Sequence, residues 1–255
     1  MQRKFLDYAI LYSFIAIAAV LAFALGKNLL VALLFFYGPP AIWLSIKASR
    51  HVRRAAIFSF FGAAAFFVID YISTLDGAWW ISTIFPRALE ILAIENSIWA
   101  FIGFYTIVLF YEYFDDGAKF HAASNRHTGL ARSVVIAAIL IFALLYILRP
   151  EVLRLPYAYL WLGLFVVLLP SIIVLALYPH LRRKVLDVSL YIFTLHLTLE
   201  IVFLHMGIAS YPGAHFLGWV QITSIRFPIE ELIYWMGMSA IATVTYYELC
   251  MDDLQ

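Results

Sequence analysis

The chain has 255 residues, of which 65% are hydrophobic and 13% are charged. Soluble domains carry about 25% charged residues, so this composition excludes an ordinary soluble domain and indicates a protein solvated by lipid. A net charge of +1 gives no reason to expect nucleic acid as a partner, and the single cysteine, Cys250, excludes an internal disulfide and a cysteine-based metal cluster. The length suits one compact membrane domain covering residues 1–255.

Apolar stretches of about 18 or more residues predict transmembrane helices. Eight such stretches follow one another, at 5–26, 29–47, 54–75, 87–114, 132–149, 156–179, 185–206 and 228–250. The expected fold class is therefore all-α, a polytopic membrane bundle of about eight transmembrane helices. Pro39, Pro40 and Pro170 lie inside two of the spans, where we expect kinks whose freed carbonyl groups are satisfied within the bundle.

The basic residues are divided unequally between the two ends of the predicted spans. Twelve of the 17 lysines and arginines fall on the side that holds the N-terminus, and five fall on the other side. Because basic residues concentrate in cytoplasmic loops, we expect an integral protein of the cytoplasmic membrane with both termini in the cytoplasm.

A glutamate motif occurs twice and suggests an internal repeat. Glu95 and Asn96 stand near the start of one apolar run, and Glu230 and Glu231 open another run 135 residues later. Both runs end in a Tyr-Glu pair, Tyr111–Glu112 and Tyr247–Glu248. We predict two related repeats of four spans each, residues 1–120 and 130–255, which run in the same direction through the membrane.

Carboxylates inside a bilayer are costly and usually serve a function. The predicted span directions bring the motif acids, Asp70, His196 and Glu200 to the outer ends of the third, fourth, seventh and eighth spans, which we expect to surround one pocket. The predicted catalytic residues are Glu230, Glu95, Glu231, Asp70 and Glu200. The structural alternative for any one of them is that it caps a helix N-terminus or pairs with Arg87 or Arg226.

Aromatic residues are abundant, and most of them are expected to fill the core or the membrane interface. Those that flank the two motifs are different, because a ring face can stabilise a carbocation much as it stabilises an ammonium ion. The predicted substrate-binding residues are Trp79, Trp80, Trp99, Tyr234, Trp235, His196 and Asn96.

We predict neither a cofactor nor a metal. No glycine-rich dinucleotide motif, phosphate loop or His-Glu-x-x-His motif occurs, so the expected chemistry is redox-neutral. The acids at the ends of the two runs could hold a divalent cation, but they lack an Asp-x-x-x-Asp spacing and a basic phosphate clamp beside them.

Residues 228–231, Pro-Ile-Glu-Glu, resemble a motif of the small integral-membrane lycopene cyclases of the heterodimeric and fused type. In that family a Pro-x-Glu-Glu/Asp motif starts a membrane helix in each of two related halves. The first half of this chain departs from the motif, because Ala93-Ile94-Glu95-Asn96 lacks the proline and has an amide in place of the second acid. The resemblance covers most of the chain in its two-halved layout and is specific around residues 228–235.

The resemblance implies a carotenoid cyclase, an isomerase that closes the linear end of a lipophilic polyene into a ring. A carboxylic acid protonates the terminal alkene, a tertiary carbocation forms, the ring closes, and a base removes a ring proton. An acid that is neutral at pH 7 needs a raised pKa, which burial in an apolar pocket supplies. On this interpretation Glu230 and Glu95 lie on either side of the reacting end, and Glu231, Asp70 or Glu200 tunes or relays the proton.

Three alternatives remain at the level of the sequence. The chain could be another cofactor-free membrane cyclase or isomerase acting on a terpenoid or prenyl lipid, or a non-catalytic subunit that binds carotenoid or lipid. A proton-coupled transporter is the third, and the expected clustering of the acids at one depth argues against it. The expected partners are a carotenoid or prenyl-lipid substrate and membrane lipid, and the oligomeric state is left open.

Overall fold

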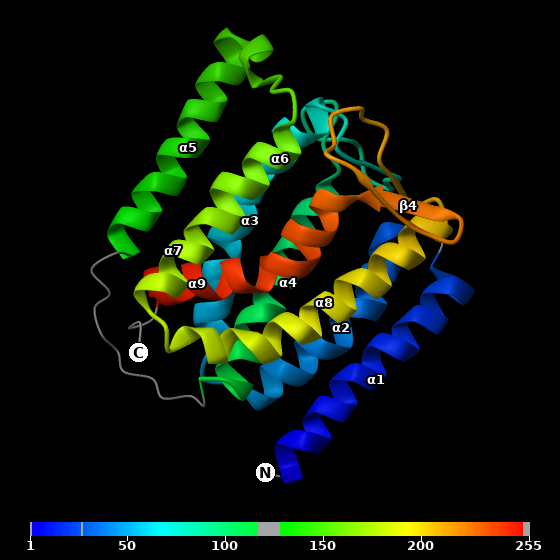
Figure 1. The fold of residues 1–255 in the computed structure, drawn as a ribbon, viewed down its shortest axis with the longest axis vertical. Helices are drawn as coiled ribbons and strands as arrows, with labels where there is room; N and C mark the ends of the chain where they lie inside the picture. Colours follow the sequence, from blue (N-terminus) through cyan, green and yellow to red (C-terminus); the bar gives the residue numbers. More distant parts are fainter. Residues whose placement is uncertain (1, 27, 117–127, 252–255) are drawn as a thin grey trace.

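The computed structural model describes residues 2–26, 28–116 and 128–251, and it is predominantly helical (Figure 1). The long helices are α1 (Gln2–Leu25), α2 (Leu29–Lys47), α3 (Val52–Leu75), α4 (Ile94–Phe114), α5 (Thr128–Leu148) and α8 (Leu181–His205). A further continuous helical segment consists of α6 (Ala158–Leu162), the π-helix η2 (Gly163–Leu168) and α7 (Leu169–Leu177). The last such segment consists of the π-helix η3 (Glu231–Met238) and α9 (Ser239–Met251), and the short 3-10 helix η1 (Pro150–Leu153) follows α5. The expectation of an all-α protein is confirmed.

The exterior of the bundle is suited to lipid. Six helices are long and apolar enough to cross a membrane, and a shorter apolar helix covers Arg132–Leu148. Large apolar side chains point outward, among them Leu34 (68% exposed) and Leu140 (63% exposed). Exposure of this apolar surface to water would cost free energy, whereas the acyl chains of lipids solvate it. The chain is therefore a membrane protein.

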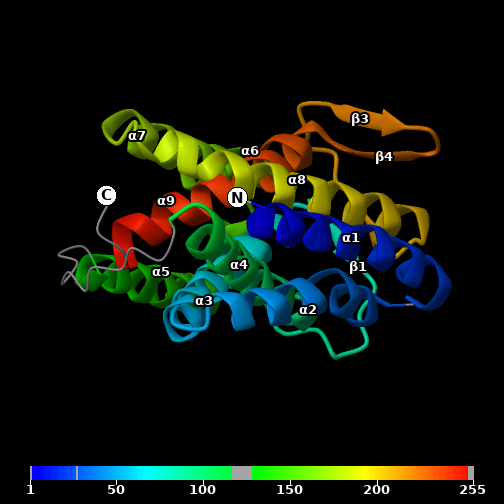
Figure 2. The same cartoon turned by 90° about the horizontal axis from the view of Figure 1, so that it is seen from below.

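The centre of the bundle is α4. It contacts α2, α3, α8 and α9, and its residues Val108, Leu109 and Phe110 are fully buried. Figure 2 shows α7 and α8 on one face of the molecule and α2 and α3 on the opposite face, with α4 and α9 between them. The helix α5 lies at the side of the bundle, where it contacts α3 and α9.

The fourth helix begins later than the sequence predicted, at Ile94 and not at residue 87. The segment before it is a loop, in which Leu89 (φ 47°) and Glu90 (φ 70°) have left-handed backbone conformations that an α-helix cannot contain. The Arg87 guanidinium holds the loop by donating to the carbonyl oxygens of Ile81 (2.6 Å) and Ile91 (2.8 Å). The apolar side chains of this loop are partly buried, so hydropathy alone extended the helix into it.

Short strands in the connecting segments were also not predicted. The two-residue strands β1 (Trp80–Ile81) and β2 (Ala209–Ser210) pair in antiparallel register. The strands β3 (Trp219–Ile222) and β4 (Ile225–Pro228) form a hairpin that lies beyond α8 (Figure 2). Because β1 precedes α4 and β2 follows α8, their pairing joins loops from the two halves of the chain at one end of the bundle.

One predicted consequence of Pro170, the satisfaction of the freed carbonyl group within the bundle, is confirmed. Pro170 lies in the first turn of α7, directly after the π-helix η2. A proline frees the carbonyl group four residues earlier, which here belongs to Val166. That carbonyl accepts a hydrogen bond from the Tyr246 hydroxyl at 2.8 Å, so the freed group is satisfied within the bundle.

At the end of α4 that is distant from β1, the two Tyr-Glu pairs cross. The Tyr111 hydroxyl donates to the Glu248 carboxyl group, and the Tyr247 hydroxyl donates to the Glu112 carboxyl group. All four side chains are buried, with both glutamates 1% exposed. The crossed pairs therefore fasten α4 to α9 with equivalent residues from the two runs.

Candidate functional site

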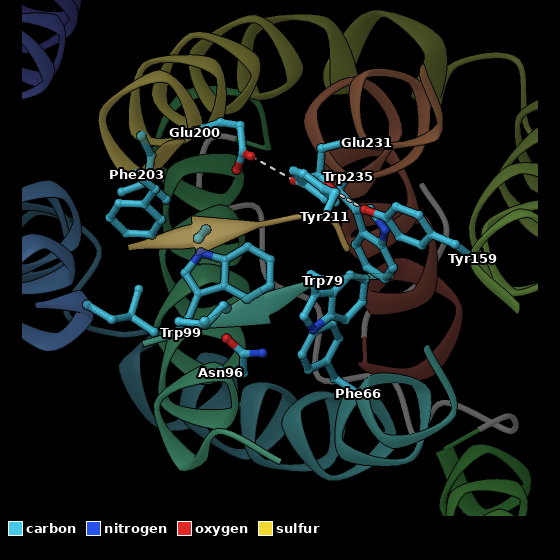
Figure 3. Close-up of a pocket in the computed structure, with 14 residues that line it drawn as sticks. Phe66, Trp79, Asn96, Trp99, Tyr159, Glu200, Phe203, Tyr211, Glu231 and Trp235 are labelled. Carbon is cyan, nitrogen blue, oxygen red and sulfur yellow. Dashed lines mark hydrogen bonds between the residues drawn. The ribbon is translucent and has the colours of Figure 1, made fainter. Parts of the chain in front are cut away.

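A cavity of about 70 Å³ lies among α3, α4, α6, α8 and η3 (Figure 3). Its walls are mainly aromatic, and the lining residues that carry a carboxyl, amide or hydroxyl group are Asn96, Tyr159, Glu200, Tyr211 and Glu231. The third, fourth, seventh and eighth predicted spans all contribute to the lining, as expected from the directions of those spans. Residues that are far apart in the sequence therefore line the same cavity.

The first carboxyl group on the cavity is that of Glu200, from α8. It accepts a hydrogen bond of 2.7 Å from the hydroxyl of Tyr211, which lies in the loop after β2. Burial and the neighbouring Glu200 raise the pKa of Tyr211 well above its usual value. The Tyr211 phenol therefore remains protonated at physiological pH, and it orients the Glu200 carboxyl group by donating a hydrogen bond to it.

The second carboxyl group on the cavity is that of Glu231, the first residue of η3. It accepts a hydrogen bond from the hydroxyl of Tyr159, a fully buried residue of α6. The Tyr159 ring stacks on Trp235 (centroids 6.0 Å apart, planes at 16°) and meets Trp79 edge-on (centroids 5.0 Å apart). Glu231 is thus held at the border of an aromatic wall (Figure 3).

Asp70 does not line the cavity but supports two residues that do. Its Oδ1 accepts hydrogen bonds from Trp79 Nε1 at 2.7 Å and from Asn96 Nδ2 at 3.2 Å. Because Trp79 and Asn96 both face the cavity, Asp70 fixes the wall from behind. Asn96 occupies the position in the first motif that Glu231 occupies in the second.

Glu95 and Glu230 also do not line the cavity. Glu95 Oε1 accepts the backbone N–H groups of Ile84 (2.7 Å) and Phe85 (3.0 Å), and Glu230 Oε1 accepts that of Leu217 (2.6 Å). The first acid of each motif therefore holds the loop that precedes its helix. The structure brings the second motif position to the cavity, whereas the sequence had placed the first one at the reacting end.

Some of the remaining predicted residues line the cavity, and others lie outside it. Trp99 and Trp235 line the cavity. His196 lies behind the wall, with its Nδ1 atom 3.0 Å from the carbonyl oxygen of Trp235 and its ring 5.8 Å from that of Trp99. Tyr234 is buried against Gly163, and Trp80 is 47% exposed beneath the Arg87 guanidinium. These last three residues are outside the lining.

Sequence reasoning missed Tyr159, Tyr211 and Phe66, which also line the cavity. The chain has 16 tyrosines and 22 phenylalanines, so single members carry no signal in the sequence. Buried carboxyl groups need a donor, and Tyr211, 11 residues after Glu200, was the one indication near an acid in the sequence. The contact between Glu231 and Tyr159 crosses 72 residues, which no local pattern reveals.

Comparison with known proteins adds no relative. No protein-family model, curated protein or solved structure matches the chain.

Proposed function

We propose that this protein is a carotenoid-type cyclase, which converts the linear end of a polyene into a ring within the membrane and without redox change. The observation that carries the proposal is the placement of two carboxyl groups, Glu200 and Glu231, on one aromatic-walled cavity inside a lipid-solvated bundle. General acid and base groups must lie within reach of the same reacting atoms, and the lining of one cavity by both carboxyl groups supports that arrangement.

The proposed reaction divides the work between the two carboxyl groups. One donates its proton to the terminal carbon–carbon double bond, which leaves a tertiary carbocation. The electron pair of a neighbouring double bond attacks this cation and forms the carbon–carbon bond of the ring. The attack moves the positive charge onto a carbon of the ring. The other group, as a carboxylate, accepts a proton from the neighbouring ring carbon, and the electron pair of that C–H bond forms the new double bond. Substrate and product have the same formula, and a proton shift between the two groups restores the enzyme.

The aromatic wall supports a cationic intermediate. Phe66, Trp79, Trp99 and Trp235 surround the cavity, and ring faces attract positive charge. They also keep out water, which would trap the cation as an alcohol. The cavity is smaller than the 150 Å³ engineered cavity that accepts benzene, so entry of an end group requires side chains of the wall to rotate.

We also propose that the bundle has eight spans in two related halves, with both termini in the cytoplasm. The crossed pairs of Tyr111 with Glu248 and Tyr247 with Glu112 support the repeat, because each half supplies the same two residues to the other. Glu95 and Glu230 support it too, since both accept backbone N–H groups of the loop before their helices. In this description only the second half retains both acids of the motif.

Expression in a bacterial host that accumulates lycopene tests the proposal. We expect cyclic pigments of unchanged mass, resolved by chromatography with mass detection. Glu231→Gln should abolish them, because the amide has the same shape but cannot deliver a proton. Glu90→Gln is the matched control, since Glu90 is an exposed acid outside the cavity and should leave the products unchanged.

Unchanged lycopene in cells whose membranes contain the protein would contradict a lycopene cyclase and direct the assay to other prenyl lipids. The second candidate function is that of a non-catalytic subunit that binds carotenoid or lipid, and the amide at Asn96 favours it. Pigment that co-purifies unaltered with the protein, equally in the wild type and Glu231→Gln, would support that function.

A further inference from the structure

A second pocket, of about 360 Å³, lies at the opposite end of α4 from the aromatic cavity. It is formed where α1 begins, α2 ends and α4 ends. Lys4, Lys47, Arg50 and His51 line it, together with the buried acid Glu112. The basic side chains come from three segments, so the basic character is a property of the folded bundle.

Two of these basic side chains already have an acidic partner. Lys47 Nζ lies 2.9 Å from Asp7 Oδ1, and His51 Nδ1 lies 3.0 Å from Glu112 Oε2. Glu112 also has Arg54 at 3.9 Å and the Tyr247 hydroxyl as a donor, so its charge is balanced from behind the pocket.

Lys4 and Arg50 retain capacity for an anion. Lys4 Nζ donates to a neutral group, the carbonyl oxygen of Phe114, at 2.9 Å. Arg50 is exposed and forms no ion pair with any residue in the part of the chain that the structure describes. Asp115 is also near Lys4, but burial and the Asp187 carboxylate raise the pKa of Asp115 to about 8, so it carries little charge at neutral pH.

Exposed apolar residues adjoin the two lysines of the pocket in the sequence, and we call them the apolar rim. Phe5 next to Lys4 is 76% exposed, and Ile46 next to Lys47 is 69% exposed. The Lys47 ammonium lies 4.6 Å from the ring centroid of Trp43, a residue type typical of the membrane interface. A ligand with a phosphate and acyl chains would satisfy both the basic floor and this rim, whereas a soluble anion would use only the floor.

We propose that this pocket binds the phosphate headgroup of an anionic phospholipid, with Arg50 and Lys4 as the phosphate contacts. The pocket lies on the side that the distribution of basic residues predicts to be cytoplasmic, where anionic lipids attract basic side chains. The inference is independent of the proposed cyclase activity, because no residue of this pocket lines the aromatic cavity.

Native mass spectrometry of the delipidated full chain in detergent tests it, with phosphatidylglycerol and phosphatidylcholine as probes. We expect tighter binding of phosphatidylglycerol, and a loss of about fivefold in its affinity for Arg50→Gln, the effect of one basic residue near an anionic headgroup. Arg53→Gln is the matched control, because Arg53 is an exposed arginine three residues away that does not line the pocket. Arg50→Lys, which keeps the charge, should retain most of the affinity and shows whether the position tolerates substitution.

Three outcomes would overturn the inference. Equal losses for Arg50→Gln and Arg53→Gln would reduce the effect to general surface charge. Equal affinity for the two lipids would remove the requirement for an anion. Displacement of phosphatidylglycerol by the same concentration of soluble glycerol phosphate would identify a site for soluble anions, without any contribution from the apolar rim.

Discussion

Glu230 and Glu231 are adjacent in the chain but have different surroundings. Glu230 is tied to the backbone of Leu217 through one oxygen, and Glu231 borders the aromatic cavity beside Tyr159. An acid that anchors a loop needs only an acceptor oxygen, whereas an acid that transfers a proton needs its ionisable group. The same substitution should therefore have different consequences at the two positions.

Glutamine at the two positions separates these roles. Glu230→Gln keeps an oxygen that can accept the Leu217 N–H, so we expect it to retain activity within about tenfold of the wild type. Glu231→Gln should lose a factor of about 10² to 10⁴, the usual contribution of a positioned acid or base. Pigment ratios at matched protein levels in membranes measure both, and equal losses would contradict the assignment of roles.

The acids and tryptophans of the site were predictable, and their tyrosine partners were not. Glu200 and Glu231 stand out in a sequence that is otherwise apolar, because a buried charge demands an explanation. Which of two adjacent acids faces the cavity depends on how η3 is wound, and the hydropathy pattern does not contain that information. Phe66 was missed because nothing distinguishes its local sequence from that of other apolar helices.

At the scale of elements, the contact between η2 and η3 depends on a missing side chain. A Cβ atom built on Gly163 would lie 2.0 Å from Tyr234 Cδ2, well inside van der Waals contact. Tyr234 is only 5% exposed and belongs to the same buried cluster as Trp235. Gly163 therefore allows the two π-helices, η2 and η3, to pack closely near the cavity.

Gly163→Ala should destabilise the protein by about 1–3 kcal/mol, as overpacking of a tight core usually does. Gly129→Ala is the control, because no atom lies within 4 Å of the added Cβ and alanine favours the helix by up to about 1 kcal/mol. Thermal unfolding in detergent should show a lower midpoint for the first variant and an unchanged or higher one for the second. A common response to both would show that the contact with Tyr234 is unimportant.

The helices themselves were predictable from long apolar runs, and the start of α2 at Leu29 was predicted correctly, while the start of α4 was not. The prediction began the fourth helix at residue 87, because the loop from Arg87 to Ala93 is as apolar as the helix that follows it. Left-handed residues at Leu89 and Glu90 end any helix there, but neither residue type announces such a conformation. The two short strand pairs were missed for a related reason, since strands of two to four residues are too brief for a periodicity.

At the scale of the whole molecule, the crossed Tyr-Glu pairs join its two halves at the end distant from the cavity. Each pair takes its tyrosine from one run and its glutamate from the other, so α4 and α9 cannot separate without breaking both. Tyr111→Phe and Tyr247→Phe each remove one donor from a buried carboxyl group, which costs about 1–3 kcal/mol.

A double-mutant cycle measures how the two pairs cooperate. Since both lie between the same two helices, we expect the double variant to differ from the sum of the single variants by more than about 0.5 kcal/mol in the free energy of unfolding. Strict additivity would mean that the pairs act independently and do not fasten the halves as one unit.

Asp115, the residue after α4, should make the stability of the protein dependent on pH. Burial, with the Asp187 carboxylate, raises the pKa of Asp115 to about 8, against about 3.9 in an unfolded chain. Between these values the folded protein holds a proton that the unfolded chain has released, so stability falls as the pH rises through this window and this loss is complete above about pH 8. Asp115→Asn cannot titrate and should flatten the profile of unfolding midpoint against pH, and a profile identical to that of the wild type would contradict the prediction.

The π-helix η3 has a consequence for the spacing of the two halves. The glutamate motif recurs after 135 residues, but the Tyr-Glu pair at the far end of the same run recurs after 136. A π-helical turn accommodates an inserted residue without ending the helix, and such turns are frequent at functional sites. The additional residue in the second half lies between Glu231 and Tyr247, a stretch that begins with η3 and continues into α9. In the two-repeat arrangement proposed above, the second half has one residue more than the first, and η3 accommodates that residue beside the cavity while the distant Tyr-Glu pairing stays intact. In that arrangement, gene duplication followed by a single-codon insertion would account for the difference of one residue between the two spacings.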